Sequence, residues 1–494
     1  MKKIKEFIIK HPIITLIVMS VLLGFLTILS GSTVSSLLYQ NFVIDNYVKD
    51  GNMFYYIAKM ISNGKTPYLE IFDHKGLYLF YYISLGYLMG GRVGLFFVEG
   101  VLMSLTYFFM ILSLRELKTQ KSLIFTFMLL FLAFHSVSGQ FPSDFELNLP
   151  FIALMTYFYS RGFNRQSDKD YLIGNAVAGI QAGIAINIRA VDTMVALGFV
   201  IGFFVICLRH KKIKEIFINA GVCLAALIFA CLPALIHSLT GGFAKEMYTS
   251  IILDNFKYVG TADSRLDSSQ VACRILVITL AIIYFVPLII NRRKMISDEF
   301  WLSIAEGIVV FLIQIIVAFY PHYVFIILPF YFVVVTRSVS LFFKEEKKWH
   351  LAFKIPSAMI ALASLMFLPM LYNISLKGNE QKIINEVKEN IPEEDRKNGH
   401  VLGIGISAAI YLNCDIDAGY PDVCCQYNHV LLSSYYTYDK LLDYLQSGDC
   451  HYVILTKGTE YYESNFVIQW FYNEGETYYT MISNESVNIF HYSL

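Results

Sequence analysis

The sequence has 494 residues, of which 56% are hydrophobic and only 16% charged, and its 39 basic residues balance 39 acidic ones. Soluble domains are about one quarter charged, whereas the mean hydropathy here is +0.53, so the composition excludes an ordinary soluble protein and indicates a polytopic membrane protein. The balanced charge also excludes the basic surface that nucleic-acid-binding proteins need.

Apolar runs follow one another along the chain as far as residue 372. A transmembrane helix needs about 20 apolar residues, and runs near this length lie at 12–30, 93–114, 121–138, 147–160, 171–188, 191–208, 215–236, 272–290, 299–319, 321–337 and 351–372. They predict an α-helical bundle with about eleven transmembrane helices. The apolar stretch 77–89 is shorter, and whether it crosses the membrane decides the side on which every later loop lies.

Basic residues settle the orientation, because cytoplasmic loops are enriched in Lys and Arg. If 77–89 lies in the interface without crossing, nearly every basic cluster falls on one side, in the loops 115–121, 161–170, 209–214, 291–299 and 337–350. A crossing would place those clusters outside. We therefore expect juxtamembrane helices in the first external loop, a cytoplasmic N-terminus and an extracytoplasmic C-terminus, in the cell membrane.

The first external loop, 31–92, carries an amphipathic segment. Apolar side chains from Phe54 to Ile61 predict one face of a short helix, which Gly64 and Pro67 end. Asp50 opens this helix directly after the first span. It could cap the helix, a role for which Asp is well suited, or act as a catalytic carboxylate.

Polar residues from separate loops are expected to meet at the outer end of the bundle. Carboxylates beside cations there suit a reaction on a phosphate-linked lipid, because a carboxylate can take a proton from an acceptor while Lys or Arg neutralises a leaving phosphate. Structural ion pairs, helix caps and interfacial anchors are the alternative for each residue. The candidates are Asp45, Asp50, Asp73, His74, Lys75, Arg92, Asp144, Glu146, Arg189, Asp192, His322 and Tyr323.

The external loop 237–271 is long, and long loops are usually functional or mobile. It mixes acidic and basic residues with Gly241, Gly242 and Gly260 as breakers. Two interpretations remain open, namely a lid over the site and a merely packed loop.

The composition changes after residue 372, so we divide the chain into a membrane domain, 1–372, and a C-terminal extracytoplasmic domain, 373–494. A helix at 381–389, a strand at 401–406, a polar helix at 438–449 and a strand at 450–457 predict a small α/β fold. The run Gly403-Ile-Gly405 lacks the third glycine of a dinucleotide-binding fingerprint. Cysteines cluster here, at Cys414, Cys424, Cys425 and Cys450, and outside the cytoplasm one or two disulfides could form, in a pairing that spacing cannot give.

Several motifs together resemble a known enzyme class. They are D-G-N-M-F, G-K-T-P-Y and F-D-H-K-G between Asp50 and Gly76, S-D-F-E-L-N-L-P-F at 143–151, Arg189 after a glycine-rich span, and Y-P-H-Y at 320–323. In this order they resemble bacterial GT-C membrane glycosyltransferases of the protein mannosyltransferase-like and aminoarabinose-transferase-like type. The C-terminal domain is similar to the external domain of Gram-positive members. Two positions depart from the pattern, Gly51 in place of an acidic residue and Leu77 in place of a proline.

The resemblance implies transfer of a sugar from a polyprenyl-phosphate donor, with inversion, on the extracytoplasmic face. Asp50 would be the base or orient the acceptor, and Glu146 or Asp144 would be the acidic residue of the second external loop. Lys75, Arg189 and His322 are our candidates for the donor phosphate, with Asp73, His74, Tyr323 and Arg92 as further site residues.

The acceptor would be a surface glycan, a teichoic-acid-type polymer, a lipid or a protein. Membrane lipids are the other expected partners, and nucleic acid is not. No cofactor and no metal site is assigned, since the outward residues lack clear ligand spacing, although a divalent ion bridging carboxylates and phosphate stays open. The alternatives are a lipid-linked glycan flippase or transporter, which should show repeats and mid-membrane charges, and an inactive GT-C-like scaffold.

Overall fold

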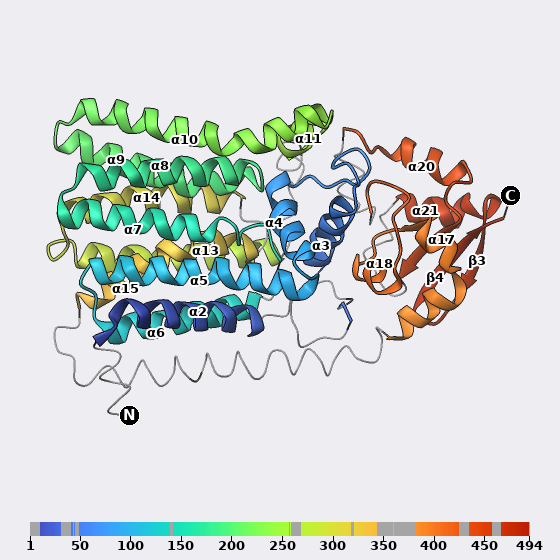
Figure 1. The fold of residues 1–494 in the computed structure, drawn as a ribbon, viewed down its shortest axis with the longest axis horizontal. Helices are drawn as coiled ribbons and strands as arrows, with labels where there is room; N and C mark the ends of the chain where they lie inside the picture. The colour runs from blue at the N-terminus through green and yellow to red at the C-terminus, as the bar shows by residue number, and fades with distance from the viewer. Residues whose placement is uncertain are drawn as a thin grey trace.

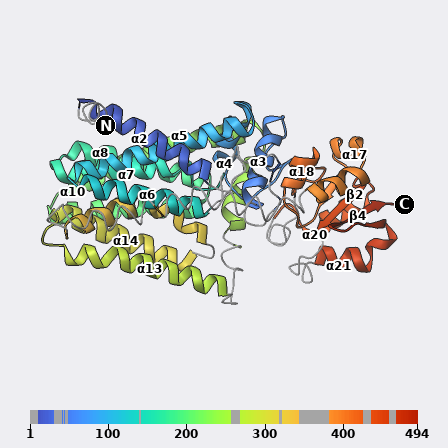
Figure 2. The same cartoon turned by 90° about the horizontal axis from the view of Figure 1, so that it is seen from below.

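The structure is a computed structural model that describes residues 10–30, 41–42, 44, 49–138, 142–255, 257, 268–317, 321–342, 359, 381–423, 434–456 and 466–493. Long helices lie side by side at one end of the molecule, and a small sheet domain lies at the other end (Figures 1 and 2). The bundle consists of α2 (Pro12–Ser30), α5 (Arg92–Glu116), α6 (Lys121–Ser138), α7 (Leu149–Arg165), α8 (Asp168–Ile186), α9 (Thr193–Arg209), α10 (Ile213–Thr240), α13 (Ser268–Ile290), α14 (Ser297–Val317) and α15 (Leu328–Ser340).

Seven helices among the described residues are long and apolar enough to cross a membrane, so the chain is a membrane protein. They are Pro12–Ser30, Arg92–Glu116, Ala190–Arg209, Ile213–Thr240, Val271–Ile290, Ser297–Val317 and Tyr323–Ser340. The predicted number of about eleven spans stays a prediction. α7 has only 17 residues, α8 begins with two acidic residues in its first turn, and the run 351–372 lies almost wholly outside the described residues.

Small residues bring helices of the bundle into close contact. α8 carries Gly179 and Gly183 four residues apart, on the face that packs against α10. A Cβ atom at Gly179 would collide with the carbonyl oxygen of Cys223, so only glycine permits this approach. Small residues at this spacing commonly let membrane helices pack backbone to backbone.

The segment 31–92, which the sequence predicts to be the first external loop, contains two short helices, α3 (Lys49–Ser62) and α4 (Leu77–Leu88). α4 has 12 residues and is therefore about 18 Å long, too short for a bilayer core of about 30 Å. Both helices lie between the bundle and the sheet domain (Figure 1). The helix predicted from Phe54 to Ile61 is present, with the apolar side chains 53–58 buried.

The described part of the loop 237–271 is packed. It forms α11 (Ala244–Tyr248) and the π-helix η3 (Thr249–Asp254). Phe243 stacks on Tyr68 of the first external loop, with 6.0 Å between the ring centroids. The Asp254 carboxylate accepts hydrogen bonds from the Ser434 hydroxyl, at 2.6 Å, and from its backbone N–H, at 3.2 Å. The described residues of this loop are therefore packed, and the lid over the site stays a prediction.

The C-terminal domain is a four-stranded sheet flanked by short helices. Its strand order is β1-β2-β4-β3, with β1 (Val401–Gly403) parallel to β2 (Tyr452–Thr456), and with β4 (Val487–Tyr492) antiparallel to both β2 and β3 (Tyr479–Ser483). The predicted helix 381–389 and polar helix are both present. The helices and helical turns are 381–390, α17 (Glu393–Lys397), α18 (Ala409–Cys414), α20 (Tyr438–Gln446), α21 (Phe466–Asn473) and η6 (Gly475–Thr477). Cys414 and Cys450 are free and buried, while Cys424 and Cys425 lie outside the described residues.

One hydrophobic cluster joins this domain to the first external loop. It contains Tyr56 of α3 and Tyr411 of α18, whose rings lie 5.2 Å apart. The Tyr56 hydroxyl donates to the carbonyl of Ile416, at 2.9 Å, and accepts from the N–H of Ala418, at 2.8 Å. The sheet domain is therefore docked on α3 through buried contacts.

Candidate functional site

An ion-pair network lies where the two loops predicted to be the first and second external loops meet the end of α8. The Asp144 carboxylate lies 2.8 Å from Lys75 Nζ through Oδ2 and 3.0 Å from Arg189 Nη1 through Oδ1. The three side chains come from three separate loops, as the predicted topology requires. We call Lys75, Asp144, Arg189 and Asp192 the outer ion-pair network.

Arg189 is held on three sides. Its Nε and Nη2 donate to the same oxygen of Asp192, at 3.0 and 2.8 Å. The guanidinium carbon lies 4.5 Å from the centroid of the Tyr323 ring, a cation–π arrangement. Arg suits such a position because its planar donors serve two carboxylates and one ring face at once.

The docking of the first external loop on the end of α8 explains why Lys75 and Arg189 are neighbours. The N–H of Gly76 donates to the carbonyl of Ile188, at 2.9 Å, and that of Tyr78 to the carbonyl of Asn187, at 3.0 Å. A Cβ atom at Gly76 would collide with the Asn187 backbone. The backbone of Lys75-Gly76 thus runs directly against the residues before Arg189, and glycine is what permits it.

Asp73 and His74 shape the turn that presents Lys75. The buried Asp73 carboxylate accepts a hydrogen bond from the backbone N–H of Lys75, at 2.8 Å, which is an Asx-turn. Nδ1 of His74 lies 3.5 Å from the same carboxylate oxygen. The Tyr68 hydroxyl donates to the carbonyl of Lys75, at 2.7 Å. Asp73 therefore organises the backbone of the loop.

Burial and pairing act against each other on the two cations. Burial lowers the pKa of Lys75, but the adjacent Asp144 carboxylate outweighs it, so the pKa lies above its usual value. Burial also lowers the pKa of Arg189, and Asp144 and Asp192 together raise it beyond its usual value. Both side chains stay charged. Their charges are balanced by two carboxylates whose side chains are 4% and 0% exposed.

Glu146 belongs to the same loop as Asp144, but its carboxylate is bonded within that loop and to α4. Its carboxylate accepts hydrogen bonds from the N–H of Ser143, at 2.6 Å, from the Ser143 hydroxyl, at 2.8 Å, and from the Tyr82 hydroxyl, at 2.9 Å. Burial and the nearby Glu99 raise its pKa well above the usual value. Glu146 is thus a buried group that ties the loop between α6 and α7 to α4.

The remaining predicted residues have different surroundings from those of the outer ion-pair network. Asp50 is exposed in the first turn of α3, where a carboxylate also stabilises the helix N-terminus. Arg92 begins α5, and its guanidinium carbon lies 4.9 Å from the centroid of the Phe42 ring. His322 lies in the 3-10 helix η4 (Pro321–Ile327), but its side chain is outside the described part of the chain.

Two residues that act on Glu146 were not predicted from the sequence. Tyr82 and Glu99 lie in helices, so they were not among the outward polar residues, yet both act on Glu146. Glu99 is completely buried in α5, and an acidic residue inside an apolar span is itself the signal that could have found it.

Comparison with known proteins relates this architecture to a family. The model of the competence-induced Ccs4 N-terminal domain matches residues 9–371, which is most of the chain. The chain belongs to this Ccs4 family. The matched range includes the whole outer ion-pair network and ends before the sheet domain.

A solved structure shares the fold. The oligosaccharyltransferase of Archaeoglobus fulgidus, in its apo form, matches with a TM-score of 0.53 and 12% identity, over 97% of this chain and 74% of that chain. At this identity the likeness shows a shared fold, so the Ccs4-family chain has the overall fold of that structure. No curated protein matches the sequence.

Proposed function

We propose that this Ccs4-family protein is a membrane glycosyltransferase that moves a sugar from a polyprenyl phosphate to a surface glycan, a teichoic-acid-type polymer, a lipid or a protein outside the cell. The observation that carries the proposal is the outer ion-pair network on a GT-C-like fold. Two cations from different loops, the part-buried Lys75 and the buried Arg189, share one carboxylate, Asp144, whose Oδ2 lies 2.8 Å from Lys75 Nζ and 3.2 Å from Arg189 Nη1. A phosphate group could take the same two contacts, because it also offers neighbouring anionic oxygens to Lys and Arg.

The reaction would be a single displacement with inversion. The acceptor hydroxyl would form the new bond to the anomeric carbon of the sugar while its proton passes to the Asp50 carboxylate. The bond between that carbon and the phosphate oxygen would break, and the polyprenyl phosphate would leave with the electron pair. Lys75 and Arg189 would stabilise the charge that develops on the leaving oxygen.

Asp144 has a different role from the one expected of a catalytic acid. It lies between the cations and holds them apart at a spacing that an anionic ligand could use. Glu146, buried and hydrogen-bonded to Ser143 and Tyr82, would keep the second external loop in place. Asp50 is the exposed carboxylate of the set, so it is the one that an acceptor can reach from outside.

One feature favours a second candidate, an inactive GT-C-like scaffold. Both cations of the outer ion-pair network are already neutralised by carboxylates, and a scaffold would need only such internal pairing. An enzyme must let a phosphate compete with Asp144 for the two cations.

Sugar transfer in proteoliposomes separates the two functions. Pooled lipid-linked sugars would serve as donor and a surface-glycan extract as acceptor, with wild type compared with Asp50→Asn, which keeps the size and capping ability of Asp50. We expect transfer by wild type and a loss of at least about 100-fold in the variant, as removal of a general base commonly gives. Asp168→Asn, at an exposed helix start on the other end of the bundle, is the matched control.

Equal transfer by wild type and Asp50→Asn would remove Asp50 from the mechanism. Absence of transfer by a wild-type protein that still binds polyprenyl phosphate would favour the scaffold.

A further inference from the structure

Two histidines lie side by side at the start of the parallel strands β1 and β2. β1 and β2 are parallel with Val401 opposite Tyr452, and a histidine precedes each of these residues. The N–H groups of His451 and Tyr452 both donate to the carbonyl of His400, at 2.9 and 3.0 Å. Neighbouring strands lie about 4.8 Å apart, so the strand register itself brings the two imidazoles together.

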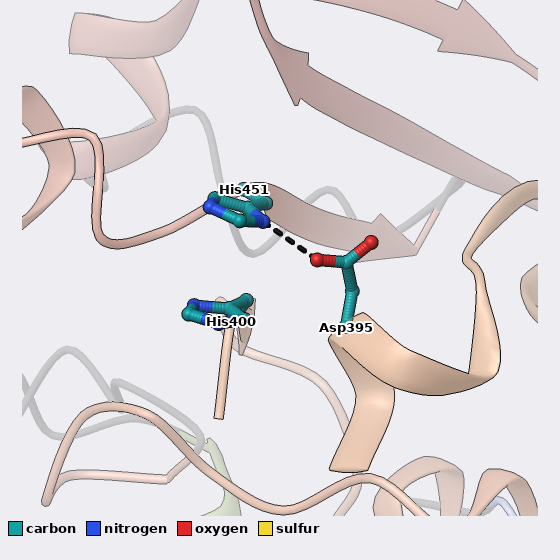
Figure 3. Close-up of side chains that lie close together, drawn as sticks. All are labelled: Asp395, His400 and His451. Carbon is teal, nitrogen blue, oxygen red and sulfur yellow. Dashed lines mark hydrogen bonds and ion pairs between the residues drawn. The ribbon is translucent and has the colours of Figure 1, made fainter. Parts of the chain in front are cut away.

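The two rings lie face to face. Their centroids are 4.1 Å apart and their planes are inclined by 11°, as Figure 3 shows. This contact is independent of the membrane bundle and of the outer ion-pair network, because both histidines belong to the sheet domain.

The hydrogen bonds of the rings leave one nitrogen of each unused. Nδ1 of His400 lies 3.0 Å from the backbone carbonyl oxygen of Asp449, which can only accept, so this nitrogen carries the hydrogen. Nδ1 of His451 lies 2.6 Å from a carboxylate oxygen of Asp395 and donates to it in the same way. In each neutral ring the lone pair is then on Nε2.

Asp395 supports the arrangement from α17. Its carbonyl accepts a hydrogen bond from the N–H of His400, at 3.2 Å, so helix and strand are joined at this point. A carboxylate behind a histidine is the arrangement that fixes ring orientation at metal sites and makes the other nitrogen a better ligand. One possible ligand atom from each of the three residues lies within 4.8 Å of the others.

The spacing and exposure fit a metal ion. Two atoms bonded to one zinc ion at about 2.1 Å lie no more than about 4 Å apart. Because an imidazole lone pair lies in the plane of its ring, the two stacked rings must rotate out of their parallel arrangement to direct both lone pairs at one ion. The side chains of His451 and Asp395 are 41% and 19% exposed, which leaves room for these rotations and for entry of an ion from solvent.

We propose that His400 and His451 form a binding site for a divalent transition-metal ion, zinc above all, with Asp395 orienting His451. Imidazole nitrogen is a preferred ligand of zinc, copper and nickel, whereas magnesium and calcium prefer oxygen. The ion would join the starts of β1 and β2 and, through Asp395, connect them to α17.

The test is zinc binding to the purified full-length protein in detergent, isolated without a polyhistidine tag. Calorimetry should detect a stoichiometric site that also raises the thermal midpoint with zinc concentration. His400→Ala and His451→Ala should each lower the affinity at least tenfold, and magnesium at the same concentration should give no heat. Asp395→Ala should weaken binding about 10–100-fold, the usual effect of removing the group behind a ligand.

His491→Ala is the matched control, because His491 lies on β4 of the same sheet and stacks on Tyr452, with 4.7 Å between the ring centroids. This variant should bind zinc as wild type does. The proposal is overturned if wild type binds no zinc, or if His491→Ala lowers the affinity as much as the His400 and His451 variants do. Circular dichroism of each variant shows whether it has folded.

Discussion

The two polar clusters of this protein differ in how completely their charges are satisfied. In the outer ion-pair network each buried cation contacts a carboxylate, and Arg189 contacts two. In the sheet domain, Asp395, His400 and His451 lie at a half-exposed surface and keep two imidazole lone pairs unused. The first cluster can bind an anion only by exchanging a partner, whereas the second can bind a cation by simple addition.

Removal of Asp144 is expected to have the largest effect. Asp144→Ala leaves two cations buried without their shared anion, and loss of one partner from a buried pair costs about 3–5 kcal/mol. We expect a large fall in the thermal midpoint of the purified protein. Asp144→Asn, which keeps the shape and one acceptor, should lose less, and a midpoint unchanged in Asp144→Ala would show that the outer ion-pair network is not buried as described.

Loss of the buried contact between α3 and the sheet domain should have the second-largest effect on stability. The Tyr56 hydroxyl is buried and bonded to the backbone on both sides of residue 417, so Tyr56→Phe leaves a carbonyl and an N–H without their partner. Groups of this kind cost about 1–3 kcal/mol each when unsatisfied. Limited proteolysis should release the sheet domain faster from the variant. Tyr435→Phe, which removes a hydroxyl that contacts the Thr249 hydroxyl at 3.4 Å, is the control.

Glu146 should make stability depend on pH. Burial and Glu99 raise its pKa in the folded protein, so the folded state binds a proton that the unfolded state has released above about pH 4.5. Wild type should therefore lose stability relative to Glu146→Gln as pH rises from about 5 to 8, by up to about 1.4 kcal/mol per pH unit. Thermal midpoints that run parallel with pH in the two proteins would exclude a raised pKa.

Asp395→Ala, without metal, should have the smallest effect on stability. Its partner His451 is 41% exposed, and half-exposed ion pairs contribute about 0–1 kcal/mol. The midpoint should stay within a few degrees of wild type, measured in the presence of a chelator. A loss as large as that of Asp144→Ala would remove the distinction between the two clusters.

Topology made part of this account predictable. Alternating spans and the positions of basic residues place Lys75, Asp144 and Arg189 at one end of the bundle, and the structure brings them into contact. The partners of these side chains were not predictable. Side-chain packing decides that Lys75 and Arg189 pair with Asp144, and that the Glu146 carboxylate accepts hydrogen bonds from Ser143. Asp50 was predicted from its place at the start of the helix after the first span, and the resemblance added its role as a base. Its exposure depends on how α3 lies against the sheet domain.

The histidine pair shows the reverse situation. His400 precedes the predicted strand 401–406 and His451 lies near the start of the predicted strand 450–457, so the signal was visible. What the sequence does not contain is the pairing of these strands, which are separated by a long connection and could have had another order or register. A shift of one residue would have turned one imidazole to the opposite face of the sheet.

The central claim is that the outer ion-pair network receives a lipid phosphate. The most direct measurement is equilibrium binding of a polyprenyl phosphate and of the polyprenol with the same chain to the wild-type protein in nanodiscs. The account predicts that the phosphate-bearing lipid binds at least tenfold more tightly and that Arg189→Lys, which keeps the charge but loses the planar donors, removes most of this preference. Equal binding of the two lipids by wild type would contradict it.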